Sequence, residues 1–200
     1  MRPNPLHDAV VFLTQPSWLT PVFWLLLLGS IVIAVAAWRR VPASRTPRDL
    51  AFAVVRLLLG IMWWQQSLWK VPPDYAGLIH WMKEMVAHAA IPEQSALVAN
   101  FVLPNIAVFG PLVYLIEVAI GVSLMLGFLS RLGGLVGLLM ALNLWLGEYS
   151  TPGEWPWTYF FLVMLQTWYT IDPPGRHLGA DLLLAARAPG RLKRPLALLA

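Results

Sequence analysis

The sequence predicts an all-α, polytopic membrane helix bundle. Hydrophobic residues make up 58% of the 200 residues and charged residues only 12%, and the mean hydropathy is +0.66. Soluble globular chains carry about 25% charged residues, so a soluble domain of this length could not cover its surface. Five apolar runs in the chain are long enough to cross about 30 Å of hydrocarbon at about 1.5 Å per residue.

The first apolar run extends from Trp18 to Trp38 and is followed directly by two arginines. A secretory signal carries its charge before a shorter apolar core and ends at a small-residue cleavage site. We therefore expect a retained helix whose N-terminus lies outside the cell. The loop 41–49 contains two further arginines and two prolines, which is typical of a short cytoplasmic connection.

The second run, from Ala51 to Lys70, carries a polar stripe on a hydrophobic helix. Helical spacing places five residues on one face: Arg56, Gly60, Trp63, Ser67 and Lys70. A charge inside an apolar span costs roughly 2.5 to 3.5 kcal/mol on insertion scales, so Arg56 is expected to face the bundle interior. Counted at about 1.5 Å per residue, Glu117 in the third run lies at a depth that an extended Arg56 side chain reaches. We therefore predict a buried ion pair between Arg56 and Glu117.

The segment 71–104 is too polar to span a membrane but is rich in Trp, Met and Ile. Asp74 is placed to cap a helix that begins at Tyr75, and Pro92 suits the first turn of a second helix. Such amphipathic segments lie in the membrane interface with their apolar face among the headgroups. We expect this one to form an outer helical segment.

Three residues of the outer segment, His80, Glu84 and His88, follow one another at intervals of four. This spacing places them on one helix face, as in sites for a divalent metal. Because no fourth ligand is evident, we interpret the face as solvated and predict no metal site.

Three more apolar runs follow. The third extends from Leu103 to Phe128, the fourth from Leu132 to Gly147 and the fifth from Trp155 to Ile171. The fifth begins with tryptophans, as expected at an aromatic belt. The fourth contains small residues at intervals of four, Gly133, Gly137 and Ala141, a pattern that predicts close helix packing.

The distribution of basic residues predicts the orientation of the spans in the cell membrane. Ten of the 14 lysines and arginines fall in segments expected to be cytoplasmic, three fall outside and one lies within the membrane. This asymmetry obeys the positive-inside rule, with the N-terminus outside and the C-terminus in the cytoplasm. The tail 173–200, with an amphipathic piece near Leu178 to Arg187, is expected to rest on the anionic inner leaflet of the bilayer.

Several classes of function are excluded. The basic residues flank apolar runs and form no cluster interleaved with aromatic residues, so the net charge of +4 does not indicate nucleic-acid binding. The chain has no cysteine, which excludes disulfides and cysteine-held iron–sulfur clusters. No histidine lies in an apolar run, so haem ligation within the bundle is not expected.

Short motifs in the second and third runs resemble the DoxX/DoxD family of small integral membrane proteins. The residues that carry the resemblance are RLLLG at 56–60, then Lys70, Glu117, Gly121, Gly127 and Arg131. The resemblance implies a four-helix membrane bundle over 50–172, to which 1–49 adds an extra transmembrane helix and 173–200 a basic tail. Relatives often carry glycine three residues before the lysine, where this chain has Ser67.

The DoxD branch of the family is the membrane subunit of thiosulfate:quinone oxidoreductase. The resemblance therefore implies a quinone-linked membrane subunit of a redox complex, with quinone as electron acceptor and a second redox subunit as partner. The alternatives are a non-catalytic membrane scaffold of a respiratory or other complex, and a carrier for a small molecule or lipid. For a carrier, a buried Arg56 and Glu117 would mark the pathway.

Under the redox interpretation the candidate catalytic residues are Glu117, Lys70 and Arg56, and the candidate quinone-binding residues are Trp63, Trp64, Tyr159 and Gln166. A buried carboxyl such as Glu117 can exchange protons with a quinone. Tryptophan faces beside Lys70 can hold a flat ring or attract an anion such as thiosulfate. Tyr159 and Gln166, seven residues apart, share a face and offer hydrogen bonds to a carbonyl. The alternatives are a structural ion pair and simple interface anchoring.

Overall fold

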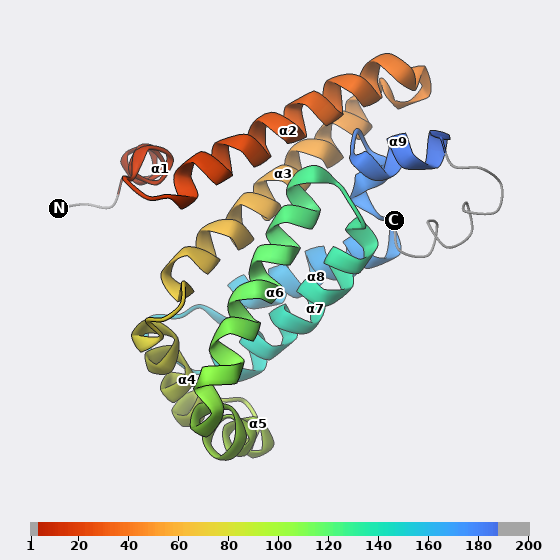
Figure 1. Cartoon of the computed structure of the whole chain (residues 1–200). Helices are drawn as coiled ribbons and strands as arrows, with labels where there is room; N and C mark the ends of the chain where they lie inside the picture. Colours follow the sequence, from red (N-terminus) through yellow and green to blue (C-terminus); the bar gives the residue numbers. More distant parts are fainter. Residues whose placement is uncertain (1–3, 188–200) are drawn as a thin grey trace.

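The computed structural model describes residues 4–187, and this part of the chain is entirely helical (Figure 1). The α-helices are α1 (Pro5–Thr14), α2 (Leu19–Arg40), α3 (Pro47–Ser67), α4 (Ala76–His88), α5 (Pro92–Leu97), α6 (Ile106–Leu126), α7 (Ser130–Gly147), α8 (Pro156–Ile171) and α9 (Ala180–Arg187). Short 3₁₀ turns are η1 (Pro42–Ser44), η2 (Leu68–Lys70), η4 (Leu103–Asn105) and η5 (Pro174–Arg176), and η3 (Val98–Val102) is a π-helical turn.

Four helical segments are long and apolar enough to cross a membrane, which marks the chain as a multi-pass membrane protein by length and composition. They are Leu19–Arg40, Pro47–Lys70, Pro92–Leu126 and Ser130–Gly147. The fifth predicted span corresponds to α8, whose 16 residues make it shorter than these four. α8 packs along α7 and leaves apolar residues such as Phe161 and Trp168 exposed.

The main core lies among α3, α6, α7 and α8. Its buried members are Leu59, Trp63, Ile120, Leu124 and Tyr169. Close contact between α3 and α6 requires glycine at two positions. A Cβ atom on Gly60 would lie 2.7 Å from the backbone nitrogen of Met125, and one on Gly121 would lie 3.0 Å from that of Trp64. Real Cβ atoms do not approach backbone as closely as 2.7 Å and rarely as closely as 3.0 Å, so the two glycines allow the short distance between the helices.

The small residues of α7 pack closely, as their spacing predicts. A Cβ atom on Gly133 would clash with the Ser123 hydroxyl of α6, and one on Gly137 would clash with the Gln166 amide of α8. Ala141 is also fully buried. α7 therefore contacts α6 and α8 through its smallest side chains.

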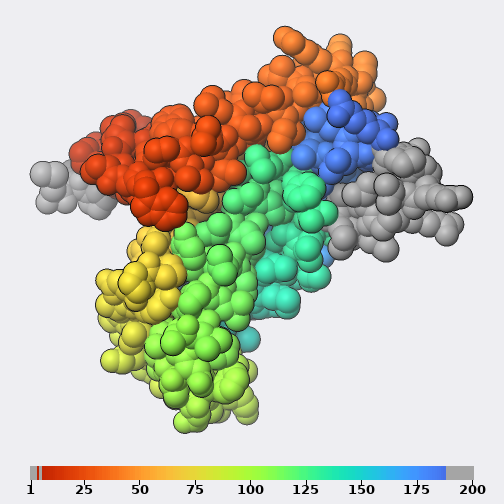
Figure 2. Space-filling model, viewed as in Figure 1, coloured from red at the N-terminus to blue at the C-terminus, as the bar shows by residue number. Residues whose placement is uncertain are grey.

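α2 lies along one side of the bundle (Figures 1 and 2). It packs through Leu19 and Phe23 against Trp64 of α3 and Met125 of α6. The buried Ser30 hydroxyl donates a hydrogen bond to the Met125 carbonyl oxygen at 2.7 Å. Its opposite face is a row of exposed apolar side chains: Leu25, Leu28, Ile31, Val32 and Val35. Such a face suits contact with lipid. The segment before α2 also forms a helix, α1.

The outer segment forms the two predicted helices. α4 begins at Ala76, one residue later than expected, and Tyr75 is its N-cap residue. Asp74 Oδ1 still accepts a hydrogen bond from the Ala76 N–H at 2.9 Å, and α5 begins at Pro92. α5 does not end before the third span, however. It continues through η3 and η4 into α6, so the third apolar segment starts at Pro92 and not at Leu103. The π and 3₁₀ turns accommodate Pro104, which has no N–H to donate, without breaking the helix.

α9, the described part of the tail, packs at the other end of the bundle from α4 and α5 (Figure 1). Its Asp181 accepts hydrogen bonds from the N–H groups of Leu129 at 2.8 Å and Ser130 at 2.9 Å, where α7 begins. Leu178, just before α9, packs against Ala37 of α2 and Ala53 of α3. The tail was expected to rest on the membrane surface, but this piece is held against the protein. The rest of the predicted tail, from 188 onward, lies outside the described residues.

Candidate functional site

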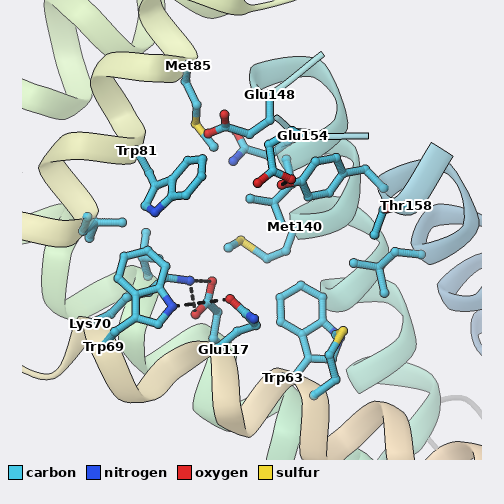
Figure 3. Close-up of a pocket in the computed structure, with 18 of the residues that line it drawn as sticks. Trp63, Trp69, Lys70, Trp81, Met85, Glu117, Met140, Glu148, Glu154 and Thr158 are labelled. Atoms are coloured by element: carbon cyan, nitrogen blue, oxygen red, sulfur yellow. Dashed lines mark hydrogen bonds and ion pairs between the residues drawn. The ribbon is translucent and has the colours of Figure 1, made fainter. Parts of the chain in front are cut away.

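A pocket of about 620 Å³ lies among α3, α4, α6, α7 and α8, at the end of the bundle covered by α4. Ligand pockets in proteins measure roughly 300 to 1,000 Å³, so this one is large enough for a small organic molecule. Its apolar lining includes three tryptophans and four methionines. Its charged lining consists of one lysine and three glutamates. The pocket is therefore largely apolar and carries a few polar groups at defined places (Figure 3).

Lys70 and Glu117 form a buried ion pair in the wall of the pocket (Figure 3). The Lys70 Nζ atom lies 2.5 Å from Oε1 and 2.6 Å from Oε2 of Glu117. The two residues are only 5% and 1% exposed. Lys70 Nζ also lies 4.4 Å from the ring centroid of Trp69, within the range of a cation–π contact. Because each charge is costly to bury alone, the pair is held together by mutual neutralisation.

The predicted ion pair between Arg56 and Glu117 is wrong. Arg56 is buried, as expected, but its Nη1 donates hydrogen bonds to the carbonyl oxygens of Leu124 and, at 2.8 Å, of Met125. The last carbonyls of a helix have no partner within it and attract a cation, so Arg56 caps the C-terminus of α6. Gly127, with a φ of 62°, ends α6 there, and a Cβ atom on it would lie 2.8 Å from Arg56 Nη1.

Arg56 therefore does not belong to the same site as Lys70. The two residues are on one helical face but 14 positions apart, which is about 21 Å along a helix. Arg56 does not line the pocket. Of the three candidate catalytic residues, the structure brings together Lys70 and Glu117 only.

The neighbouring tryptophans Trp63 and Trp64 face different parts of the molecule. Trp63 lines the pocket and is 1% exposed, and its indole N–H has no hydrogen-bond partner. Trp64 is also buried but packs against Leu19 and Phe23 of α2. Successive residues of a helix point about 100° apart, and here that difference turns Trp64 away from the pocket. Trp64 lies outside the pocket lining.

Tyr159 and Gln166 also differ in whether they line the pocket. Tyr159 lines the pocket, and its hydroxyl donates a hydrogen bond to Glu154 Oε2 at 3.0 Å. Gln166 lies two turns further along α8, is completely buried against Gly137 and does not line the pocket. Of this predicted pair, only Tyr159 is in place to contact a bound molecule.

Four pocket residues on α4 belong to the segment that the sequence pattern assigned to the membrane interface. They line the pocket because α4 folds back over the end of the bundle: Leu78, Trp81, Met82 and Met85. Leu78, Met82 and Met85 are buried and recur at intervals of four and three. That stripe predicts a buried face but does not say whether protein or lipid covers it.

The exposed side of α4 carries the three residues with metal-ligand spacing. His80 is exposed, and His88 Nε2 lies 3.4 Å from Glu84 Oε2. Within 4–187, no group of three His, Cys, Asp or Glu side chains is placed to hold a metal ion.

Two pocket carboxyl groups lie just beyond α7, where the sequence gave no sign of a site. Glu148 is 2% exposed, and its Oε2 accepts a hydrogen bond from the Thr151 hydroxyl at 2.7 Å. Its Oε1 has no partner. Burial raises the pKa of the Glu148 carboxyl, and the hydrogen bond from Thr151 partly opposes this. In Figure 3, Glu148 and Glu154 lie across the pocket from the Lys70–Glu117 pair.

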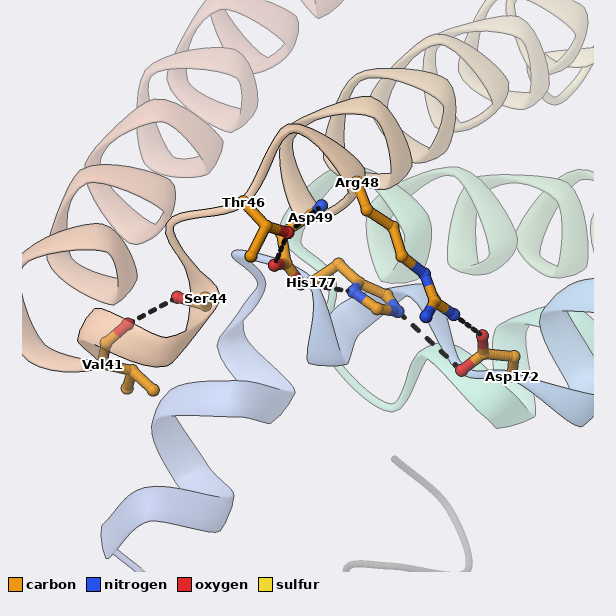
Figure 4. A network of polar contacts seen from close by, with 7 residues as sticks. All are labelled: Val41, Ser44, Thr46, Arg48, Asp49, Asp172 and His177. Atoms are coloured by element: carbon orange, nitrogen blue, oxygen red, sulfur yellow. Dashed lines mark hydrogen bonds and ion pairs between the residues drawn. The ribbon is translucent and has the colours of Figure 1, made fainter.

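A second polar network lies away from the pocket, where α3 begins and α8 ends (Figure 4). His177 Nδ1 is 2.7 Å from Asp49 Oδ1, and its ring lies 4.4 Å from that of Phe52. Arg48 Nη2 is 3.4 Å from Asp172 Oδ2. These contacts join the start of α3 to the segment 172–177, which is distant in sequence, and this indicates a structural role.

Comparison of the chain with models of protein families, with curated proteins and with solved structures found no match. The indications of function are therefore the pocket and the ion pair in its wall.

Proposed function

We propose that this protein is a quinone-linked integral membrane subunit of a redox complex, and that the pocket holds the quinone ring. The observation that carries this proposal is the buried Lys70–Glu117 pair in the wall of an apolar, tryptophan-lined pocket. Quinones are flat, hydrophobic molecules with carbonyl groups, and the pocket combines apolar surface with a few polar groups of this kind.

The pocket residues have distinct roles in this proposal. Trp63, Trp69 and Trp81 provide aromatic surface for the ring. The Lys70 ammonium group is a hydrogen-bond donor for a quinone carbonyl. Glu117, in contact with Lys70, is placed to exchange protons as the quinone takes up two electrons and two protons to become a quinol.

The resemblance to the DoxX/DoxD family leads us to propose thiosulfate:quinone oxidoreductase as the activity of the complex. Joining two thiosulfate ions through a new S–S bond releases the two electrons that reduce one quinone. The pocket contains three glutamates and one lysine, which is already paired with Glu117. Because such surroundings repel a dianion, we place the oxidation of thiosulfate outside this pocket, on a partner subunit.

The proposal includes a topology for the helices in the membrane. We propose that α3, α6, α7 and α8, which share one core, form the four-helix bundle of a DoxX-like protein, that α2 is an added span, and that α8 crosses as the fifth. The excess of basic residues next to α2 and after α8 supports a cytoplasmic location for those ends. The pocket and α4 then lie in the outer half of the membrane, with the N-terminus outside.

Quinone binding tests the proposal directly. The protein is placed in lipid nanodiscs and titrated with a short-chain benzoquinone and a short-chain naphthoquinone, while the intrinsic tryptophan fluorescence is followed. We expect saturable quenching by at least one of them. Trp63→Phe should weaken binding, whereas Trp157→Phe, on the exposed side of α8 and outside the pocket, should not.

The ion pair is tested by replacing both members, Lys70→Met with Glu117→Leu, because a double replacement leaves no unpaired buried charge. We expect this variant to fold and to bind quinone more weakly. If the folded wild-type protein binds neither quinone, the proposal fails and a non-catalytic membrane scaffold becomes the better account.

A further inference from the structure

The exposed residues of the pocket lining come from only two helical segments. Trp69, at the end of the segment that begins with α3, is 40% exposed, and Phe161 of α8 is 56% exposed. Gln66 and Thr158, on the same two segments, are also exposed. All the lining residues that come from α4, α6 and α7 are buried or half-buried. The pocket therefore opens between α3 and α8, and we call Gln66, Trp69, Thr158 and Phe161 its mouth. Trp69 and Thr158 stand on opposite sides of the pocket in Figure 3.

The packing of the helices explains this opening. Within residues 4–187, α3 packs along α6, α6 along α7 and α7 along α8, whereas α3 and α8 are not packed along each other. Helices packed in this order leave a gap between the first and the last unless side chains fill it. Tyr169, near the end of α8, belongs to the same core cluster as Leu59 of α3. Side chains therefore fill the gap at that end, and the pocket occupies it at the end near α4.

The mouth carries no charged side chain. The charged residues of the lining lie deeper, since Lys70, Glu117 and Glu148 are at most 5% exposed and Glu154 is half-buried. A charged side chain is costly in hydrocarbon, so an uncharged mouth suits an opening that faces lipid. Phe161 lies five residues, or about 8 Å, from the start of α8. In the proposed topology the mouth therefore opens into the outer leaflet of the bilayer.

We propose that the ligand enters this pocket sideways from the bilayer, and that it is a quinone with a long hydrocarbon tail. The ring lies beside the Lys70–Glu117 pair, and the tail leaves through the mouth between α3 and α8. This inference rests on the proposed quinone function and adds the class of quinone and its route. Leu162 and Leu165, next to Phe161 on α8, give the route an apolar wall. A volume of about 620 Å³ holds the ring but not a long tail as well.

The first test compares two quinones that share one benzoquinone ring, one without a tail and one with a long hydrocarbon tail. Both are titrated into the protein in lipid nanodiscs, and their concentrations are expressed as mole fractions in the lipid, which removes the effect of partitioning. We expect the two dissociation constants to agree within about threefold, because the tail exchanges lipid for a protein surface that is similarly apolar. A pocket without a lateral opening would reject the tailed quinone by steric clash.

The second test closes the mouth. The chain has no cysteine, so the Phe161→Cys variant carries a single thiol, which is labelled in detergent with a bulky aliphatic maleimide before transfer to nanodiscs. The label should weaken binding of the tailed quinone at least about tenfold, because it clashes with the tail, and should weaken binding of the tailless ring less. Met164→Cys with the same label is the matched control. Met164 is 53% exposed on α8 but does not line the pocket, so binding should not change.

The outcomes separate this inference from the proposed function. If the wild-type protein binds the tailless ring but rejects the tailed quinone, the inference is overturned while quinone binding itself stands. The same holds if the label on the Phe161→Cys variant leaves the affinity for the tailed quinone unchanged. If the wild-type protein binds neither quinone, the proposed function fails first. The comparison of the two quinones in the wild-type protein decides even if a cysteine variant does not fold.

Discussion

The ammonium nitrogen of Lys70 lies 2.5 and 2.6 Å from the two carboxylate oxygens of Glu117, a residue 47 positions further along the chain. Lys70 ends the helical segment that begins with α3, and Glu117 lies in the middle of α6. The contact joins two helices that already pack closely through Gly60 and Gly121. The pair is therefore part of both the fold and the pocket, and its two roles require separate experiments.

The first prediction concerns the contribution of this pair to stability. Lys70→Met should lower the free energy of unfolding by about 3 to 5 kcal/mol, because it leaves Glu117 as an unpaired buried charge. Adding Glu117→Leu should recover most of that loss. Thermal denaturation in detergent measures both effects, and Lys83→Met, at an exposed position of α4, is the matched control. A double variant as unstable as the single one would contradict the prediction.

The second prediction concerns Arg56, which caps α6 far from the pocket. Arg56→Met should leave the carbonyl oxygens of Leu124 and Met125 unpaired and lower stability by about 1 to 3 kcal/mol for each lost partner. Quinone affinity should not change. Since Arg56 and Glu117 share no contact, the effects of replacing them should add within about 0.5 kcal/mol in a double-mutant cycle. A large coupling energy would indicate the direct Arg56–Glu117 pairing that the sequence predicted and would contradict the structure.

The local pattern of the second apolar run predicts much of this arrangement. The stripe from Arg56 to Lys70 is buried at every predicted position, because helical spacing alone decides which side chains share a face. The partner of each charge could not be predicted in this way. The depths of the two residues, counted from the membrane boundary, predicted that Arg56 pairs with Glu117. That count does not include the carbonyl oxygens that lack a partner where α6 ends at Gly127.

The rest of the pocket depends on tertiary contacts that no local pattern contains. Glu148 stands at the end of an apolar run and looks like an ordinary boundary residue, yet it is buried. Trp81 and Met85 belong to a stripe that suits a membrane surface equally well. Only the return of α4 over the end of α7 places these residues around one cavity. A surface stripe therefore predicted the helix but not what covers it.

The third prediction tests the proposed orientation. Reporter fusions after Arg40 and after Ala200 should both report the cytoplasm, and a fusion near Glu93 should report the outside, because basic residues are concentrated next to the first two positions. A cytoplasmic signal near Glu93 would place the pocket on the inner side. A C-terminus outside the cell would rule out a fifth crossing by α8.

The last prediction concerns the pH dependence of stability. Burial raises the pKa of the Glu148 carboxyl above its ordinary value of 4.5, with smaller effects from Thr151, Glu154, Glu84 and His88. The folded protein therefore holds this proton more tightly than the unfolded chain does. The stabilisation is fully present below the ordinary value and is lost as the pH rises through the raised pKa of the folded state.

The Glu148→Gln variant has no ionisable group at this position. The difference in stability between wild type and variant therefore reports the titration of Glu148 separately from that of its neighbours. We expect the stability of the wild type relative to the variant to fall as the pH rises from about 4.5 to neutrality, measured by denaturation midpoints in the same detergent. A difference in stability that stays constant over this pH range would contradict the prediction.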